Sequence, residues 1–283
     1  ETFPEYQKEY GAGYGPYYGS TGDFYDVDVD GDGQDDYLIP VGEDASFGGR
    51  FDPSVMVYDW SGIYPQLDSY QQARPWTAAE NGPETLFRKG ISNYTNISLD
   101  GGNEDGTFRF GYTNDDRQGI LPNSLIKKDI VDLSGTYNFT DKLSATAKGT
   151  YTRVSGRGRY GTGYDSGNVV QMMRQWFQTN VDLQEQRDAY FATGQNITWN
   201  PNGLNDLSPH YFDNPYFTLY DNYQSDLRNR FIGRAQLDYQ FNDWLSAFAR
   251  FGVDTYSDLQ EERKNIGSVD QSFYQKYHRN FEQ

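Results

Sequence analysis

The chain has 283 residues and a formal net charge of −17, and this acidity excludes a nucleic-acid-binding surface, which needs clustered cations to neutralise phosphates. It contains no cysteine, which excludes a disulfide framework and thiolate zinc sites. Only 36% of its residues are hydrophobic but 17% are aromatic, a balance typical of a β-barrel with a polar lumen. Composition alone leaves a soluble, tyrosine-rich β protein, such as a surface lectin or a β-sandwich, equally open.

The first 25 residues are rich in tyrosine and glycine, and residues 26–85 have the turn-forming composition of one long loop. Within this loop, residues 26–36 read Asp-Val-Asp-Val-Asp-Gly-Asp-Gly-Gln-Asp-Asp. Aspartates spaced around glycine bring hard oxygen ligands onto one centre, which is the arrangement that calcium prefers. The sequence therefore predicts a structural Ca2+ site in this turn.

Two registers of the calcium turn fit the spacing. The register that starts at Asp26 has Gln34 at its ninth place and lacks a late acid. The register that we prefer has glycine at its sixth place, and its predicted ligands are Asp28, Asp30, Asp32, the carbonyl of Gln34, and Asp36. No glutamate stands at the twelfth place and no helix pair flanks the turn, which excludes a sensor EF-hand. An acidic turn without a metal is the alternative.

Strands with alternating polarity follow along the chain. A first pair is predicted at 95–99 and 107–113, and two longer hairpins are predicted at 131–152 and 231–254. Turns of two or three residues close the long hairpins, at 140–142 and at Asn242-Asp243. On the first strand of the first long hairpin, the apolar face consists of Val131, Leu133, Tyr137 and Phe139. Strands of about ten residues, apolar on one face, with short turns at one end and long loops at the other, indicate part of a large antiparallel transmembrane β-barrel.

Residues 153–227 form a second long loop, and its length points to a function because ordinary connections are far shorter. One helix is predicted within it, with Asn168 as its cap and Gly194 as its stop. The apolar stripe of this helix consists of Val169, Met172, Met173, Trp176 and Phe177. The stripe packs either on its own loop or on a partner protein.

Aromatic side chains of the two long loops are candidates for contact with sugar rings, peptides or a partner, and the simpler alternative is that they hold the loops together. The candidates are Trp60, Trp76, Trp176, Phe177, Trp199, Tyr211 and Tyr216. The chain has only two histidines, and no pair of carboxylates stands out, so we do not expect an enzyme. The Gly-x-Gly-x-x-Gly letters of residues 156–161 do not open into a helix, which excludes a dinucleotide site.

One stretch reads Phe-Arg-Phe-Gly-Tyr-Thr-Asn from residue 108 and leads to Gly-Ile-Leu-Pro-Asn-Ser at residues 119–124. It resembles the early barrel strands of the SusC/RagA class of TonB-dependent outer-membrane transporters of Bacteroidetes. Weaker similarity to the same class is spread from the start of the chain to about residue 256, in segments 4–11, 57–60, 96–104, 174–177 and 213–216. None of these segments is catalytic.

The resemblance implies nutrient transport across the bacterial outer membrane. Members of the class form a plugged barrel of about 22 strands and take up oligosaccharides or peptides, driven by TonB, beneath a surface lipoprotein of the SusD class. We therefore expect residues 1–283 to be an early part of the barrel, with the plug, the TonB-contacting region and the later strands outside this chain. The main alternative is a calcium-stabilised cell-surface glycan-binding β protein without transport, since it shares the aromatic residues, the acidity and the aspartate turn.

Overall fold

The chain divides into two compact units, each assembled from segments that are distant in sequence. The sheet unit comprises residues 89–159, 224–262 and 279–283, and the loop unit comprises residues 1–88, 160–223 and 263–278. The computed structural model describes residues 3–159, 161, 163–164, 167–174, 176–222, 224–269 and 277–282.

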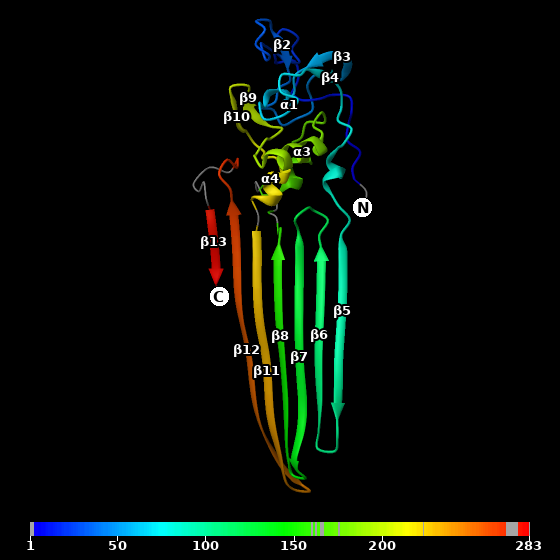
Figure 1. The fold of residues 1–283 in the computed structure, drawn as a ribbon, viewed down its shortest axis with the longest axis vertical. Coiled ribbons are helices and arrows are strands. Elements are labelled where there is room, and N and C mark those ends of the chain that lie inside the picture. Colours follow the sequence, from blue (N-terminus) through cyan, green and yellow to red (C-terminus); the bar gives the residue numbers. More distant parts are fainter. Residues whose placement is uncertain are drawn as a thin grey trace. The chain divides into compact units, whose positions relative to one another are not determined.

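The sheet unit is one antiparallel sheet of seven strands in the order β13-β12-β11-β8-β7-β6-β5 (Figure 1). The strands are β5 (Ile91–Gly102), β6 (Gly106–Gln118), β7 (Leu125–Thr140), β8 (Leu143–Arg157), β11 (Gln224–Asn242), β12 (Leu245–Lys264) and β13 (Tyr277–Glu282). The prediction of an antiparallel β fold is confirmed. The first six strands run from 12 to 20 residues, longer than the predicted ten, because pairing continues beyond the apolar stretches into polar sequence.

Three tight turns close the hairpins of the sheet at one end, and the β11–β12 hairpin reaches furthest (Figure 1). Short polar side chains favour such turns because their oxygen atoms replace a backbone acceptor. Each turn begins with an oxygen that accepts two backbone N–H groups, and these oxygens belong to Asn103, Thr140 and Asn242. The turn predicted at 140–142 is confirmed. The second predicted turn is also present, but it lies at Asp243-Trp244, one residue later than predicted.

The loop unit contains only short elements. They are β1 (Tyr25–Val27), β2 (Asp36–Leu38), β3 (Asp52–Val57), α1 (Trp60–Ile63), β4 (Arg74–Trp76), the 3-10 turn η1 (Pro83–Leu86), α2 (Val169–Met172), α3 (Leu183–Thr193), β9 (Pro201–Gly203), β10 (Asp206–Pro209) and α4 (Pro215–Tyr220). The strands form the antiparallel pairs β1–β2, β3–β4 and β9–β10. None of the helices in the described part of the chain has the length and apolarity that crossing a membrane requires.

Aromatic packing and buried amides join the two long loops into this unit. Trp199 is 0% exposed and stacks on Phe212, with ring centroids 5.5 Å apart. The buried amide of Gln178 donates to the backbone carbonyls of Pro40 at 3.1 Å and Glu43 at 2.7 Å. Buried carbonyls need such partners, since leaving one unsatisfied costs free energy comparable to a lost hydrogen bond. Each long loop therefore supplies hydrogen-bond partners that the other needs.

The prediction of one helix between residues 168 and 194 is wrong, because α2 and α3 are separate there. Asn168 caps α2 as predicted. Asp182 then caps a new helix, its side chain accepting the backbone N–H groups of the first turn of α3. Gly194 ends α3 in the left-handed conformation, with φ of 64°, which glycine adopts without strain. The first helix, α2, ends at Met172, so residues 176–177 of the predicted stripe lie outside both helices.

Candidate functional site

One face of the seven-stranded sheet, here called the apolar face, carries a continuous band of exposed apolar side chains. Along β11, apolar residues occupy every second position from Phe231 to Phe241. The large side chains of the band are 37% to 69% exposed, and they are Ile97, Leu99, Phe108, Phe110, Leu133, Tyr137, Phe231, Leu237, Tyr239, Phe241 and Phe251. Proteins that face only water rarely expose so large a contiguous apolar area. Contiguous apolar areas of this size are typical of surfaces that contact lipid or another protein.

The height of the apolar band fits a bilayer. Residues 231–241 of β11 extend over about 33 Å at a rise of roughly 3.3 Å per residue. The strands of transmembrane barrels tilt by about 40°, and at that tilt the band would be about 25 Å tall, the height of the apolar belt of such barrels.

Tyrosines mark the end of the band nearer the long loops. Tyr112, Tyr151 and Phe231 lie in one cross-strand row on β6, β8 and β11. The Tyr112 hydroxyl donates to Asp129 at 2.7 Å and the Tyr151 hydroxyl donates to Asn229 at 2.8 Å, and both acceptors stand in the next, polar row. Each ring thus lies on the apolar side of the boundary with its hydroxyl on the polar side. Tyrosines at the interface between lipid and water have this arrangement.

Aromatic residues also mark the end of the band nearer the short turns. Tyr137 packs edge-on against Phe139, with ring centroids 5.1 Å apart, and Tyr239 packs in the same way against Phe241 at 4.8 Å. Trp244 stands in the β11–β12 turn and is 82% exposed. The apolar face therefore carries aromatic groups at both of its boundaries.

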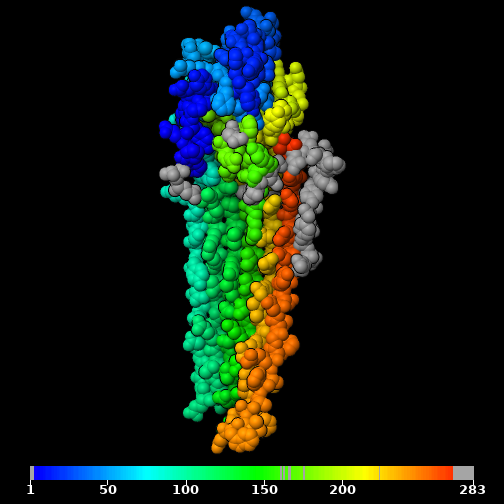
Figure 2. Space-filling view, turned by 180° about the vertical axis from the view of Figure 1, so that it is seen from behind, coloured from blue at the N-terminus to red at the C-terminus, as the bar shows by residue number. Residues whose placement is uncertain are grey.

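The opposite face of the same strands, here called the polar face, is rich in charged and hydroxyl groups. Cross-strand hydrogen bonds and ion pairs link its side chains, as in the Thr150 hydroxyl that donates to Asp132 at 2.6 Å. Arg230 and Asp254 form an ion pair at 2.5 Å, and Arg228 pairs with Asp258. The sheet thus presents two chemically different faces, one suited to lipid and one suited to water or to a polar protein surface. Figure 2 shows β5–β8, β11 and β12 side by side from behind the view of Figure 1.

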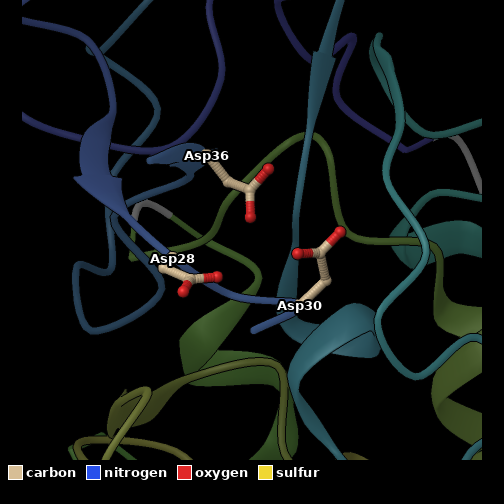
Figure 3. Close-up of side chains that lie close together, drawn as sticks. All are labelled: Asp28, Asp30 and Asp36. Atoms are coloured by element: carbon tan, nitrogen blue, oxygen red, sulfur yellow. The ribbon is translucent and has the colours of Figure 1, made fainter. Parts of the chain in front are cut away.

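The predicted calcium turn lies in the loop unit, between β1 and β2. Asp28 and Asp30 follow β1. Asp36 is the first residue of β2, and it pairs with Val27, the last residue of β1. The three carboxylates point toward one another (Figure 3), and one oxygen atom from each lies within 4.8 Å of the others. Negative charges this close repel, and a divalent cation bound by hard oxygen ligands would remove that repulsion. The chemistry of this donor set fits Ca2+.

Backbone hydrogen bonds hold the turn in shape. Asp28 accepts the N–H groups of Gly31 at 2.7 Å and Gly33 at 3.0 Å, and Asp36 accepts the Val29 N–H at 2.9 Å. Both glycines have positive φ, 83° and 88°, a conformation that other residues rarely adopt. The carboxylates are thereby positioned by the backbone of the turn itself.

Tyr58 joins the aspartate turn, although no signal in the local sequence predicts it. Its hydroxyl donates to Asp30 at 3.2 Å. Burial, with the nearby carboxylates of Asp36 and Asp30, raises the pKa of Tyr58 to about 12. The hydroxyl therefore stays protonated at neutral pH and can hold Asp30 in place. The strand that leads to Tyr58, β3, is distant in sequence from the turn, so only the tertiary structure brings the two together.

The structure gathers three of the five predicted calcium ligands. Asp28, Asp30 and Asp36 form the cluster. Asp32 lies outside it and accepts the Gln34 N–H at 2.8 Å, so its carboxylate stabilises the turn in this structure. The ligand roles of Asp32 and of the Gln34 carbonyl stay predictions.

The aromatic residues predicted to contact a substrate or partner fall into two groups. Five of them are at most 5% exposed and pack in the core of the loop unit, and they are Trp60, Trp76, Phe177, Trp199 and Tyr216. A side chain without accessible surface offers no contact to a ligand in this conformation, and packing accounts for these five. Trp176 is half-buried, and Tyr211 is 49% exposed and stacks on His210, with ring centroids 3.8 Å apart. For these two residues the contact role stays a prediction.

No protein-family model matches this chain, and none of the curated protein sequences matches it either.

Proposed function

We propose that this chain forms part of the wall of a transmembrane β-barrel importer in a bacterial outer membrane, of the TonB-dependent SusC/RagA class that its segments resemble. The importer would take up oligomers of sugars or amino acids together with a SusD-class lipoprotein. The observation that carries this proposal is the two-faced sheet. Its apolar band is the right height for lipid, aromatic groups mark both boundaries of the band, and the other face is polar.

Transport in such a protein is a physical process without covalent chemistry. The apolar face would contact lipid acyl chains, and the polar face would face the interior of the barrel. The tight turns, at Asn103, Thr140 and Asn242, would lie on the periplasmic side, because short turns face the periplasm in barrels of this kind. The two long loops join the strands at their opposite ends and would therefore be reached from the exterior side, where substrate arrives. TonB would act through a region outside this chain.

In this setting the aspartate turn is a structural clamp. A Ca2+ ion held by Asp28, Asp30 and Asp36 would fix the β1–β2 turn, and Tyr58, which directly follows β3, would hold Asp30 in place. An exterior loop faces a medium in which calcium is plentiful enough for a site of modest affinity. The exposed stack of Tyr211 on His210 and the half-buried Trp176 offer the predicted aromatic contacts to substrate or to the SusD-class lid.

Single-cysteine spin labels on β11 test the proposal, and residues 1–283 contain no other cysteine that would take up the label. We expect labels at Ala235 and Leu237, on the apolar face, to collide readily with oxygen dissolved in lipid. Labels at Arg234 and Gln236, on the polar face, should be sheltered from lipid. Accessibility to oxygen and to a water-soluble nickel complex, measured in native membranes, should therefore alternate with a period of two residues.

The rival function, a surface glycan-binding β protein without transport, gives a different outcome. Labels on the apolar face would then be accessible to the nickel complex, or shielded from both reagents by protein, and no oxygen maximum would appear. Such a protein would also bind its glycan at the cell surface without transporting it, and loss of TonB would have no effect on this binding. Either result would replace the importer proposal with the rival.

A further inference from the structure

Three cations and one hydroxyl group gather beyond the tyrosine row, on the apolar-face side of β7 and β8. Arg153, Ser155 and Arg157 alternate along β8, so their side chains point to the same side as Tyr151. Lys127 of β7 stands directly opposite Ser155. We call Lys127, Arg153, Ser155 and Arg157 the cationic cluster, and its three cations are all exposed.

The guanidinium of Arg153 is left without an ion pair, although an acid stands nearby. Asp129 lies directly opposite Arg153 across β7 and β8. However, its carboxylate accepts the Tyr112 hydroxyl at 2.7 Å and the Asn114 amide at 2.9 Å, both from β6. Asp129 is thereby engaged on the side of β7 that is away from β8. Among the described residues Arg153 forms no ion pair, so its donors are open to an anion from outside.

The other two cations are also available to such an anion. Arg157 stands opposite the uncharged Leu125 and Ser225, and it forms no ion pair within the described part of the chain. Lys127 pairs with Asp116 at 3.4 Å, but the side chain of Lys127 is 53% exposed and that of Asp116 is 32% exposed. Ion pairs that are open to solvent contribute little, so Lys127 can exchange this partner for a stronger anion.

The spacing of the cationic cluster suits a phosphate group. Arg153 and Arg157 are separated by about 13 Å along the strand, at roughly 3.3 Å per residue. Ser155 lies midway between them, and both long side chains can converge on an anion above its hydroxyl. Guanidinium groups bind phosphate through paired, parallel N–H bonds, and a lysine adds a point charge. The cluster thus offers forked donors, a hydroxyl and an ammonium group to one phosphate.

The position of the cluster indicates that this phosphate belongs to a lipid. The boundary of the apolar band lies between the row of Tyr151 and the row of Arg153. From this boundary, Ser155 is about 8 Å away along the membrane normal, for a strand tilt of about 40°. The headgroup layer of a bilayer is roughly 5–8 Å thick on each side of the hydrocarbon core. Because long basic side chains extend toward polar partners at the interface, the cluster lies within reach of this layer.

We infer that the cationic cluster binds the phosphate of an anionic lipid headgroup in the exterior leaflet of the membrane. The occupant is a lipid because the cluster lies on the same face as the apolar band and directly adjoins the tyrosine row at its boundary. The inference rests on the proposed function, which assigns this face to lipid and the short turns to the periplasm. Its test separates the two, since contact with lipid and preference for phosphate are measured independently.

Photo-cross-linking to lipid tests the inference. Leu227 of β11 stands directly opposite Ser155, and Asn93 of β5 lies in the same cross-strand row, about 14 Å from Ser155 at roughly 4.8 Å per strand. The complete protein with Leu227→benzoylphenylalanine, or with Asn93→benzoylphenylalanine, is reconstituted into nanodiscs of phosphatidylcholine that contain a minor share of phosphatidic acid. Illumination joins the photoreactive side chain to the lipid beside it, and mass spectrometry identifies that lipid.

We expect capture at Leu227 to favour phosphatidic acid by about fivefold for each arginine of the cluster, the preference that one basic residue provides at an anionic membrane surface. Capture at Asn93, at the same height but away from the cluster, should follow the composition of the nanodisc. This comparison leaves the cluster unchanged, so it does not depend on whether a variant of the cluster folds.

Two double variants provide the matched comparison at Leu227. Arg153→Gln with Arg157→Gln should reduce the preference for phosphatidic acid to the level found at Asn93. Arg234→Gln with Arg250→Gln removes the same charge from the polar face and should leave the preference unchanged.

The outcomes distinguish the inference from the proposed function. Capture of no lipid at either position, phosphatidylcholine included, would overturn both. Capture of the two lipids in the proportions of the nanodisc at both positions would overturn the inference alone. Equal capture of a lipid with a carboxylate headgroup would also overturn it, because the cluster would then attract any negative charge. Loss of the preference on addition of inorganic phosphate would overturn it as well, because the cluster would then be a site for free phosphate.

Discussion

Asp28, Asp30 and Asp36 each place one carboxylate oxygen within 4.8 Å of the others. At the scale of single residues, we therefore expect calcium to stabilise the loop unit through these three side chains. Calcium should raise the thermal midpoint of the loop unit relative to chelator, because a ligand that binds only the folded state stabilises it, by about 2.7 kcal/mol at a hundredfold excess over Kd. Asp28→Asn should remove most of this response. Thermal unfolding with calcium and with chelator measures it.

Asp35→Asn is the matched control, since it makes the same change in charge in the same turn. Asp35 is exposed and lies outside the cluster. An equal response to calcium in the wild type and in Asp28→Asn would contradict the proposed site. If both variants lost the calcium-dependent stabilisation equally, calcium binding would depend only on the net charge of the turn.

Trp199 is the second residue with a measurable role. Its side chain is fully buried between Phe212 and Phe177, and its indole N–H has no hydrogen-bond partner among the described residues. Trp199→Ala should lower the free energy of unfolding of the loop unit by about 3–5 kcal/mol. Trp199→Phe should cost much less, because it keeps an aromatic ring and removes the unpaired donor.

Denaturant unfolding monitored in the loop unit measures both Trp199 variants. Tyr17→Ala is the control for loss of an aromatic ring, since Tyr17 is 78% exposed. A cost for Trp199→Ala no larger than that for Tyr17→Ala would show that the packing around Trp199 is loose. Trp199 would then regain its place among the candidates for substrate contact.

At the scale of the element, one step along the backbone of β11 changes the apolar face for the polar face, which the proposed function assigns to lipid and to the barrel interior. Ala235 lies on the apolar face, opposite Ala147 and Phe251, and Gln236 lies on the polar face, opposite Arg250. Ala235→Arg should destabilise the folded barrel by about 2–4 kcal/mol, the cost of an arginine on the lipid face at the bilayer midplane. Gln236→Arg should cost at most about 1 kcal/mol, the size of the repulsion between like charges that stand opposite one another in a sheet, since Arg250 faces this position.

Folding of the complete protein into lipid vesicles over a urea gradient measures the difference between these neighbours. The comparison is matched, because both variants add one positive charge to the same strand. Equal costs in the two variants would mean that lipid does not cover the apolar face.

The alternation along β11 was predictable from sequence because side chains of a strand alternate with a period of two, which is a local property. The lengths of the strands were not. Residues 224–230 and 255–264 carry polar side chains on both faces, and they are strands because the neighbouring strands pair with them. Local periodicity carries no information about such pairing.

At the scale of the whole molecule, the prediction concerns the membrane itself. The native protein that carries this chain should remain in the membrane fraction after washes with high salt and alkaline carbonate, and should require detergent for extraction. An integral barrel resists these washes because its apolar belt is buried in lipid, whereas charge-mediated attachment is screened by salt. Fractionation followed by detection with an antibody against the loop unit measures this outcome. Release by the washes alone would instead favour the surface glycan-binding protein.

The sequence by itself determined the features that depend on neighbours along the chain. The alternating strands, the turn at 140–142, the caps at Asn168 and Gly194, and the glycine-rich aspartate turn all follow from local backbone geometry and side-chain chemistry. The net charge of −17 likewise argues against a nucleic-acid partner without any structure.

Only the tertiary structure decided which distant residues meet. Cross-strand register joins Tyr112 to the row of Tyr151, and it sets Lys148 opposite Arg234. Packing between the two long loops buries Trp199, and the predicted helix is broken between the end of α2 at Met172 and the cap of α3 at Asp182. These outcomes depend on long-range pairing and on burial in a shared core, and the energies of such contacts are set by residues that the local sequence does not contain.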